Sequence, residues 1–556
     1  MSRLPTAPDA GDQQSMTTIQ SNVDAATIGG RLASAEPSLA SAIADWITTS
    51  DHKKIGRLFI GSSLLFAVGV SVLGGLLGFE RMSAKGYSVL EADAVVQLFS
   101  AYQFALVYAV VAPLFVGLAI AVVPLQLGSR SLSYPRLASF GLWAWVSGLI
   151  VTLVSIAANG GPGGGNPDMV DLYLLALGLV ALGLSAASVS IVVTVLTSRA
   201  PGMSLLRTPM FSWSALMGAM ATVLTMPVLI GTLVYTYVDH ANGRLAFGGN
   251  TDVSKWIGWS FTQPQTFVFA VMAVGVLAEL APIVANVRQP LRPVMLFGVT
   301  LVSTAALGGA TQSTHSFSWN GTIADKVKEL IPFALFNLLP ILGVLIVLAL
   351  GGLAAKNGRV KLTASFVFAF LGTGMLFVGM LVHALSMIGP AALAGTVAQE
   401  SSTLYVVYGA VMVALGAVAH WGPKLWGRCL PKKEMFGLAA LALLATILSS
   451  LPLVLAGFLD QPSNVVAGWS YDASGLLNAV SMIGHGLMLV TVLGFIGLAF
   501  KNFTSGAFAS DDPWDAHSLE WSIPSPAPAE NFSDIAIVGS AEPLLDVKPA
   551  RQGVSA

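Results

Sequence analysis

Apolar runs of about 20 residues recur along the chain, and each is long enough to cross roughly 30 Å of membrane hydrocarbon as an α-helix. Hydrophobic residues make up 55% of the 556 residues and charged residues only 10%, which excludes a water-soluble globule. No ten-residue alternation of apolar and polar residues appears, so barrel strands are not expected. Twelve runs are predicted to span the membrane: 57–80, 97–125, 139–158, 169–198, 211–237, 259–284, 292–309, 330–355, 361–388, 401–425, 435–457 and 476–500. The predicted fold is an all-α integral membrane protein, a bundle of twelve transmembrane helices.

Lys and Arg are distributed unevenly between the loops. When the N-terminus is placed inside, seventeen of them flank the inner ends of the runs and six lie in the outer loops. Positively charged loops stay in the cytoplasm, so both termini are predicted to be cytoplasmic. The long cytoplasmic N-terminal tail favours the inner (plasma) membrane of a bacterium. A net charge of −1 gives no indication of a nucleic-acid partner.

The two ends of the chain differ in composition from the apolar middle. Residues 1–50 and 504–556 are rich in Ser, Ala, Pro, Asp and Gly, so we expect a disordered N-terminal tail, a C-terminal tail of the same kind, and a transmembrane domain over 51–503. The single cysteine, Cys429, has no partner for a disulfide or a thiolate metal site. No phosphate-binding or dinucleotide-binding glycine motif is present, which argues against a primary pump or a nicotinamide enzyme.

Three polar stretches flank the apolar runs in a specific order. They are Trp46–Gly56 before the first run, Val123–Arg136 at the end of the second, and Asp512–Phe532 after the last. Together they resemble subunit I of the haem-copper oxidases, the cytochrome c oxidase family, and the resemblance extends over about 45–532. It implies a fold built around a low-spin haem, a high-spin haem and a copper ion held by six histidines.

The resemblance places other residue types where the family has these histidines. Tyr102, in Ser100–Ala105, stands at a haem-ligand position of the second helix. The sixth helix of the family carries Gly-His-Pro-Glu-Val-Tyr, and this chain has Thr262–Phe267 there. The copper ligand, the proton-passing carboxylate and the linked tyrosine are thereby replaced by Gln263, Gln265 and Phe267.

The later helices show the same replacement. Ala419–Pro423 resembles the family's His-Trp-Phe-Pro, and counting back from it puts Ser401 and Thr403 at the two remaining haem-ligand positions. His315 alone matches the paired copper histidines. The family's inner lysine, propionate-binding arginine pair and acidic proton entry align with Val344, Asp460–Gln461 and Ser131.

Imidazole binds iron and copper well, whereas hydroxyl and amide groups do not, so the substituted positions predict a chain without the family's haem and copper. Tyrosine is itself a ligand of ferric haem, so a haem on Tyr102 is kept as an alternative. His383 and His485, inside apolar runs, are expected either to form a relocated metal site or to be hydrogen-bonded interior residues. A set of polar side chains is expected to gather where the binuclear centre lies in the family, as a packing network or a wet cavity: Gln263, Gln265, Gln312, Ser313, Ser401, Ser402 and Thr403.

These substitutions favour a divergent, ligand-depleted subunit-I-like protein that acts as a structural or assembly subunit of a respiratory complex. Its expected partners are membrane lipid and the other subunits of that complex. Two other functions remain open from the sequence. One is an active terminal oxidase, from cytochrome c or quinol to oxygen, with non-standard ligands. The other is a small-molecule or ion carrier that uses the polar cavity. Whether the chain is an enzyme is left open.

Overall fold

The computed structural model describes residues 39–83, 85–244, 246, 265–306, 316–469, 471, 473–534 and 537–548, with the side chains of 39, 42, 93 and 265–268 outside that description. Contacts divide the chain into two units, 1–49 and 50–556. In the first, residues Leu39–Ile47 form helix α2, within the stretch expected to be a disordered tail. Everything below concerns the second unit.

The described residues of the second unit form helices joined by turns and loops, and no strand is named among them. Its α-helices are α3 (His52–Glu80), α4 (Ala92–Phe104), α5 (Ala112–Gln126), α6 (Pro135–Ala157), α7 (Pro167–Thr197), α8 (Met210–Ala241), α11 (Gln265–Ala285), α12 (Arg292–Val302), α14 (Ile323–Phe333), α15 (Leu339–Asn357), α16 (Ala364–Ser386), α17 (Val397–Trp426), α18 (Lys432–Gly457), α19 (Ser474–Ser505) and α20 (Pro543–Val547). The π-helical stretches η1 (Ala105–Val111) and η4 (Ala334–Leu338) join α4 to α5 and α14 to α15, and short 3-10 turns are η2 (Leu205–Arg207), η5 (Gly389–Ala391) and η6 (Leu519–Ser522).

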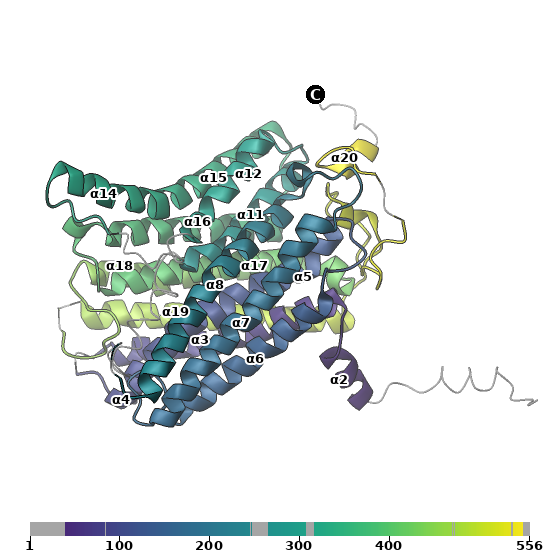
Figure 1. Cartoon of the computed structure of the whole chain (residues 1–556). Helices are drawn as coiled ribbons and strands as arrows, with labels where there is room; N and C mark the ends of the chain where they lie inside the picture. Colours follow the sequence, from purple (N-terminus) through teal and green to yellow (C-terminus); the bar gives the residue numbers. More distant parts are fainter. Residues whose placement is uncertain are drawn as a thin grey trace, which may run out of the picture. The chain divides into compact units, whose positions relative to one another are not determined.

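Within the described residues, ten helices are long and apolar enough to cross a membrane. Two shorter apolar helices are Phe269–Ala285, within α11, and Arg292–Val302, which is α12; the residues directly before 265 and directly after 306 lie outside the description. The prediction of an all-α, multispanning membrane protein is confirmed, whereas the count of twelve spans and the cytoplasmic position of the termini stay predictions. Figure 1 shows the long helices lying side by side as one bundle.

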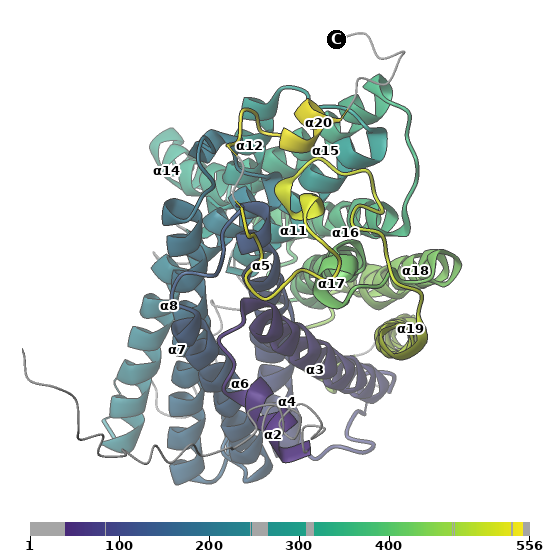
Figure 2. The ribbon, with the colours of Figure 1, turned by 90° about the vertical axis from the view of Figure 1, so that its right-hand side faces the viewer.

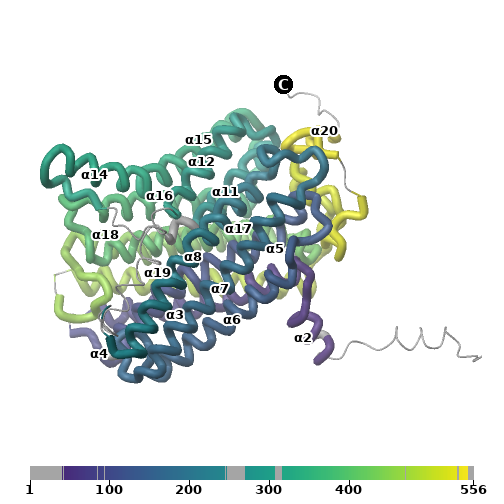
Figure 3. The backbone as a smooth tube through the Cα atoms, in the orientation of Figure 1, coloured from purple at the N-terminus to yellow at the C-terminus, as the bar shows by residue number. Residues whose placement is uncertain are grey.

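Two spans lie at the centre of the bundle. The span Ala94–Gln126, built from α4, η1 and α5, and the span of α17 are buried along the whole of their most apolar stretch, whereas the other eight are 33–61% buried there. A helix that is apolar on every side belongs in an interior. α17 packs against α16 and α18, and α5 packs against α3 and α7. Figure 3 shows the backbone of each of these helices. The positions aligned with haem ligands therefore lie on the two innermost spans.

Local signals set the ends of these helices. Asp51 caps α3, because its side chain accepts a hydrogen bond from the Lys53 amide at 2.9 Å. Thr396 caps α17 in the same way, through the Ala398 amide. α17 ends at Gly427, whose φ of +80° suits a residue without a Cβ.

Residues 511–532, called the C-terminal cap below, differ from the disordered tail expected from composition. Figure 2 shows the cap, in yellow, passing over the ends of α11 and α17. Ala516, Leu519 and Trp521 are buried in it. The Pro and Ser content that predicts disorder also suits an extended segment whose backbone is hydrogen-bonded to helix ends. The contacts that order this segment come from distant parts of the chain.

Candidate functional site

The predicted haem-ligand position Tyr102 lies in a compact cluster with Tyr408 and His485. The Tyr408 hydroxyl and His485 Nδ1 are 2.7 Å apart and hydrogen-bonded. Both phenol rings meet the imidazole edge to face, with ring centroids 6.2 Å away for Tyr102 and 5.7 Å away for Tyr408. The Tyr102 hydroxyl is buried in the same cluster. The cluster thus joins the two central spans to α19.

Gly74 of α3 makes room for this cluster. A Cβ at this position would lie 2.8 Å from two atoms of the His485 imidazole and 3.0 Å from the Tyr102 hydroxyl. Real Cβ atoms are essentially never closer than 3.0 Å to a heavy atom, so any larger residue would displace the histidine. The cluster is close-packed on this side.

Ser401 and Thr403, the other two predicted haem-ligand positions, are buried on α17. Ser401 donates a hydrogen bond to the Ser450 carbonyl of α18 at 2.8 Å. Thr403 bonds within its own helix, to the Gln399 carbonyl at 3.4 Å, and lines a cavity of about 140 Å³ together with Tyr102. The Ser401 hydroxyl thus links α17 to α18, whereas the Thr403 hydroxyl bonds within α17.

The same cavity is bordered by Glu400, the carboxylate nearest to the predicted site. Arg81 holds it through two parallel bonds, Nη1 to Oε2 at 2.7 Å and Nη2 to Oε1 at 2.8 Å. The Asn464 amide donates a further bond to Oε1 at 2.7 Å. The two side chains are 4% and 10% exposed, so this is a buried, bidentate ion pair. Glu400 is fixed as a structural anion at this end of α17.

The C-terminal cap brings the three family-like stretches together. Asn531, from the third stretch, accepts a bond from Lys53 Nζ at 3.0 Å and contacts the His52 ring, both in the first stretch. Its amide nitrogen donates to the Ser129 carbonyl, in the second stretch, at 3.0 Å. Segments more than 400 residues apart therefore meet at one side chain.

A buried lysine fastens the cap to α17. Lys424 Nζ donates to the Ile523 carbonyl at 2.5 Å and to the Asp511 carbonyl at 2.8 Å, and the Lys424 carbonyl accepts from the Ala527 amide at 3.0 Å. Glu520 is buried beside it and accepts bonds from Ser518, Trp421 and Gln126. Burial raises the pKa of Glu520.

Several predicted site residues have no described side chain. Gln263 and His315 lie outside the described residues, and Gln265 and Phe267 are described only as backbone of α11. Their predicted roles as cavity-lining residues and as a lone copper ligand stay predictions, as does the carrier function that depends on the cavity. Val344 is fully buried on α15.

The other aligned positions are described. Ser131 lies exposed after the second span. Gln461 is buried and accepts a bond from the Tyr471 hydroxyl at 2.6 Å. His383 is buried on α16, a helix that contributes no residue to the cluster of Tyr102, Tyr408 and His485. Among the described residues, no group of three or more His, Cys, Asp or Glu side chains is placed to hold a metal ion.

A family model described as cytochrome c and quinol oxidase polypeptide I matches residues 54–496. The chain belongs to this family. Cytochrome c oxidase subunit 1 of Bacillus subtilis is 26% identical, over 91% of this chain and 83% of that protein. Cytochrome c oxidase subunit 1 of Corynebacterium diphtheriae is also 26% identical, over 90% of this chain and 91% of that protein. A heme-copper terminal oxidase dimer solved by cryo-EM shares the fold, with a TM-score of 0.61 and 13% identity over 81% of this chain and 84% of that one.

Family membership corrects one expectation. The prediction that the chain takes no cofactor is wrong, because haem-copper oxidase subunit I is a family that binds haem and copper. The expectation failed because it considered only the aligned positions. Substitutions there do not show whether histidines from other parts of the chain lie close enough together to bind haem or copper. His485, which matches no family ligand position, lies directly beside Tyr102.

The residues around Tyr102 do not fit a haem in the arrangement described. The cavities that border Tyr102 and Tyr408 have volumes of about 140 Å³ and about 10 Å³. Drug-sized ligands already occupy pockets of about 300–1,000 Å³. Gly74, His485 and the two tyrosines fill the space between the helices instead. A macrocycle would enter this position only if these side chains moved apart.

Sequence reasoning missed the partners that complete the site. Arg81 appears in the sequence only as one of six outer basic residues, and Tyr408 only as part of an apolar run. One signal was present for His485, a histidine within an apolar span, because such a residue is costly unless hydrogen-bonded or functional. The observed bond to Tyr408 agrees with the hydrogen-bonded interpretation.

Proposed function

We propose that this chain is a subunit-I-like component of a respiratory complex whose main role is structural, holding and assembling the other subunits in the membrane. Tyr102 and Ser401, at family ligand positions, contact side chain or backbone of another helix, and Thr403 bonds within α17. The family-like stretches at the helix ends, by contrast, interlock through Asn531 and Lys53. Packing and chemistry are carried by different residues, so one can be retained while the other changes.

The single observation that carries the proposal is the hydrogen bond from Ser401 to the Ser450 carbonyl. At a position where the family has a metal-binding imidazole, the Ser401 hydroxyl instead links α17 to α18. Oxidase subunits named as subunit 1 work within multisubunit assemblies, so we expect the partners of this chain to be other subunits of a respiratory complex and membrane lipid.

An active terminal oxidase, passing electrons from cytochrome c or quinol to oxygen, is the second candidate. The cluster of Tyr102, Tyr408 and His485 favours it, because both phenolate and imidazole are ligands of haem iron. Such a role would require the cluster to open and Gly74 to lose its close contact with the imidazole.

Reduced-minus-oxidised absorption spectra of the complex purified with wild-type, Y102F and H485L chains separate the two candidates. The structural role predicts that Y102F leaves every haem band of the assembled complex unchanged in position and height. Loss or displacement of a band in Y102F or H485L, with the same subunits still assembled, would replace the structural role by the oxidase role. Y405F, which removes the hydroxyl of a buried tyrosine on α17 outside the cluster, is the matched control.

A further inference from the structure

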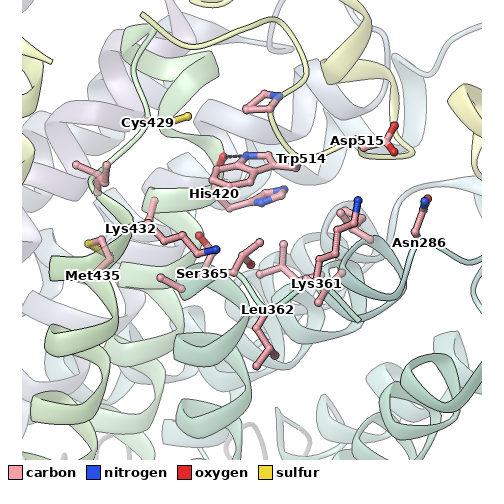
Figure 4. Close-up of a pocket in the computed structure, with 18 residues that line it drawn as sticks. Asn286, Lys361, Leu362, Ser365, His420, Cys429, Lys432, Met435, Trp514 and Asp515 are labelled. Carbon is pink, nitrogen blue, oxygen red and sulfur yellow. Dashed lines mark hydrogen bonds between the residues drawn. The ribbon is translucent and has the colours of Figure 1, made fainter. Parts of the chain in front are cut away.

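A cavity of about 430 Å³ lies between α11, α16, α17 and α18, at the end of the bundle that the C-terminal cap covers. Cap residues Pro513–Asp515 form one of its walls. Figure 4 shows His420 and Trp514 at its centre, with Lys432 and Lys361 on opposite sides. Its volume falls within the range of small-molecule sites, about 300–1,000 Å³.

The inner wall of this cavity is apolar. Leu280, Ile283 and Val284 of α11 line it, and Met435 of α18 faces them from the other helix. All four side chains are buried. Leu362 lies at the edge and is 54% exposed. Such a surface accommodates hydrocarbon and continues to an exposed apolar side chain at its rim.

The rim of the cavity is positively charged. Lys361 and Lys432 are both exposed, and neither forms an ion pair with any described residue. Asp515, the carboxylate that lines the cavity, is already paired with Lys548 at 2.8 Å. Two ammonium groups facing one opening attract an anion, and lysine is a common phosphate-binding residue.

One buried polar atom in the cavity wall lacks a partner. His420 is 2% exposed, and its Nε2 has no hydrogen-bond partner within the described residues. Its ring is held by stacking on Trp514, with centroids 5.6 Å apart, and Trp514 Nε1 donates to the His420 carbonyl at 2.9 Å. Buried polar groups are satisfied as a rule, so a ligand oxygen near His420 would complete the site.

We propose that this cavity binds one anionic phospholipid. Its phosphate lies between Lys361 and Lys432, its glycerol-ester oxygens approach His420, and one acyl chain follows the apolar wall of α11 and Met435. Basic pockets between membrane helices recognise anionic lipid headgroups in this way. A zwitterionic lipid brings its own cation close to the two lysines and binds more weakly for that reason. A free phosphate ion would leave the apolar wall empty.

Native mass spectrometry of the full chain in detergent, titrated with phosphatidylglycerol, tests this proposal. The variant K361S/K432S removes both rim charges, and R359S/K433S removes two exposed charges at neighbouring positions that do not line the cavity. The expected result is one tightly bound phosphatidylglycerol in wild type and in R359S/K433S. The affinity should fall about 25-fold in K361S/K432S, from about fivefold for each lysine.

Four outcomes would overturn the proposal. Equal binding of phosphatidylglycerol and phosphatidylcholine would show that charge does not select the ligand. Equal weakening in both double variants would assign the effect to general surface charge. Displacement of the lipid by millimolar inorganic phosphate, or stoichiometric binding of a short-chain quinone in its place, would identify a different ligand. Each result is independent of whether the chain assembles with other subunits.

Discussion

The substitution K424M tests how the C-terminal cap is held. Lys424 is fully buried and donates hydrogen bonds to the carbonyls of Asp511 and Ile523. Methionine preserves the length and the apolar stem but leaves both carbonyls without this donor. Each unsatisfied buried acceptor costs about 1–3 kcal/mol, and removal of a buried charge offsets part of that cost. We expect the cap to open more easily by about 2–4 kcal/mol.

Hydrogen exchange followed by mass spectrometry measures this change. Peptides from residues 511–532 should lose protection by roughly 30- to 700-fold in K424M, because opening is the step that exposes their amides. Peptides from the middle of α17 should keep the protection of wild type, since the effect is local. K433M is the matched control, because Lys433 is exposed at the start of α18 and makes no bond to the cap in the described structure.

Three results would refute the reasoning. Unchanged protection of 511–532 in K424M would mean that the two hydrogen bonds do not hold the cap. An equal loss of protection in K433M would show that a lysine anywhere near this end has the same effect. A uniform loss across α17 would instead indicate global destabilisation, and the local account would fail.

Three further predictions concern stability. E400A should destabilise the protein by about 3–5 kcal/mol in a detergent denaturation series, because Arg81 is left buried and unpaired. The double variant R81M/E400L should recover most of that loss. A cost of E400A below about 1 kcal/mol would contradict a stabilising role of the ion pair. S401A should cost only about 1 kcal/mol in the same assay, the value of its bond to the Ser450 carbonyl, and a loss above 3 kcal/mol would mean that Ser401 does more than pack. Burial, and then the charge of a nearby lysine, lowers the pKa of His517 from 6.5 to about 4, so between these pH values the unfolded chain binds a proton that the folded chain does not. The free energy of unfolding should therefore be highest above pH 6.5 and fall by about 2 kcal/mol by pH 5, and this fall should be absent from H517L. The same pH dependence in both proteins would refute the prediction.

The sequence is informative about the helices because their signals are local. A run of about 20 apolar residues predicts a span wherever it occurs, and Asp51 and Thr396 mark helix starts by bonds to amides two residues away. The two central spans were not distinguishable from the others, because burial depends on which helices surround them. The twelve-span count rests on runs that partly lie outside the described residues.

The site and the cap were less predictable because their contacts are distant in sequence. Composition alone predicts disorder for the C-terminal segment. Asn531 contacts Lys53 and Ser129 only in the folded bundle, so these ordering contacts cannot be read from local sequence. Glu400 carries no sequence signal for its pairing with Arg81. Family alignment directs attention to Tyr102, which lies on a central span, yet it did not foresee that His485 would lie beside it.

The most direct test of the proposed function is purification of the tagged, full-length chain from its native membrane in a mild detergent. The account predicts a stoichiometric complex with other respiratory-chain subunits, and it predicts that loosening the cap by K424M lowers their yield while K433M does not. A monomeric chain, free of partners in several mild detergents and stable on its own, would contradict the central claim.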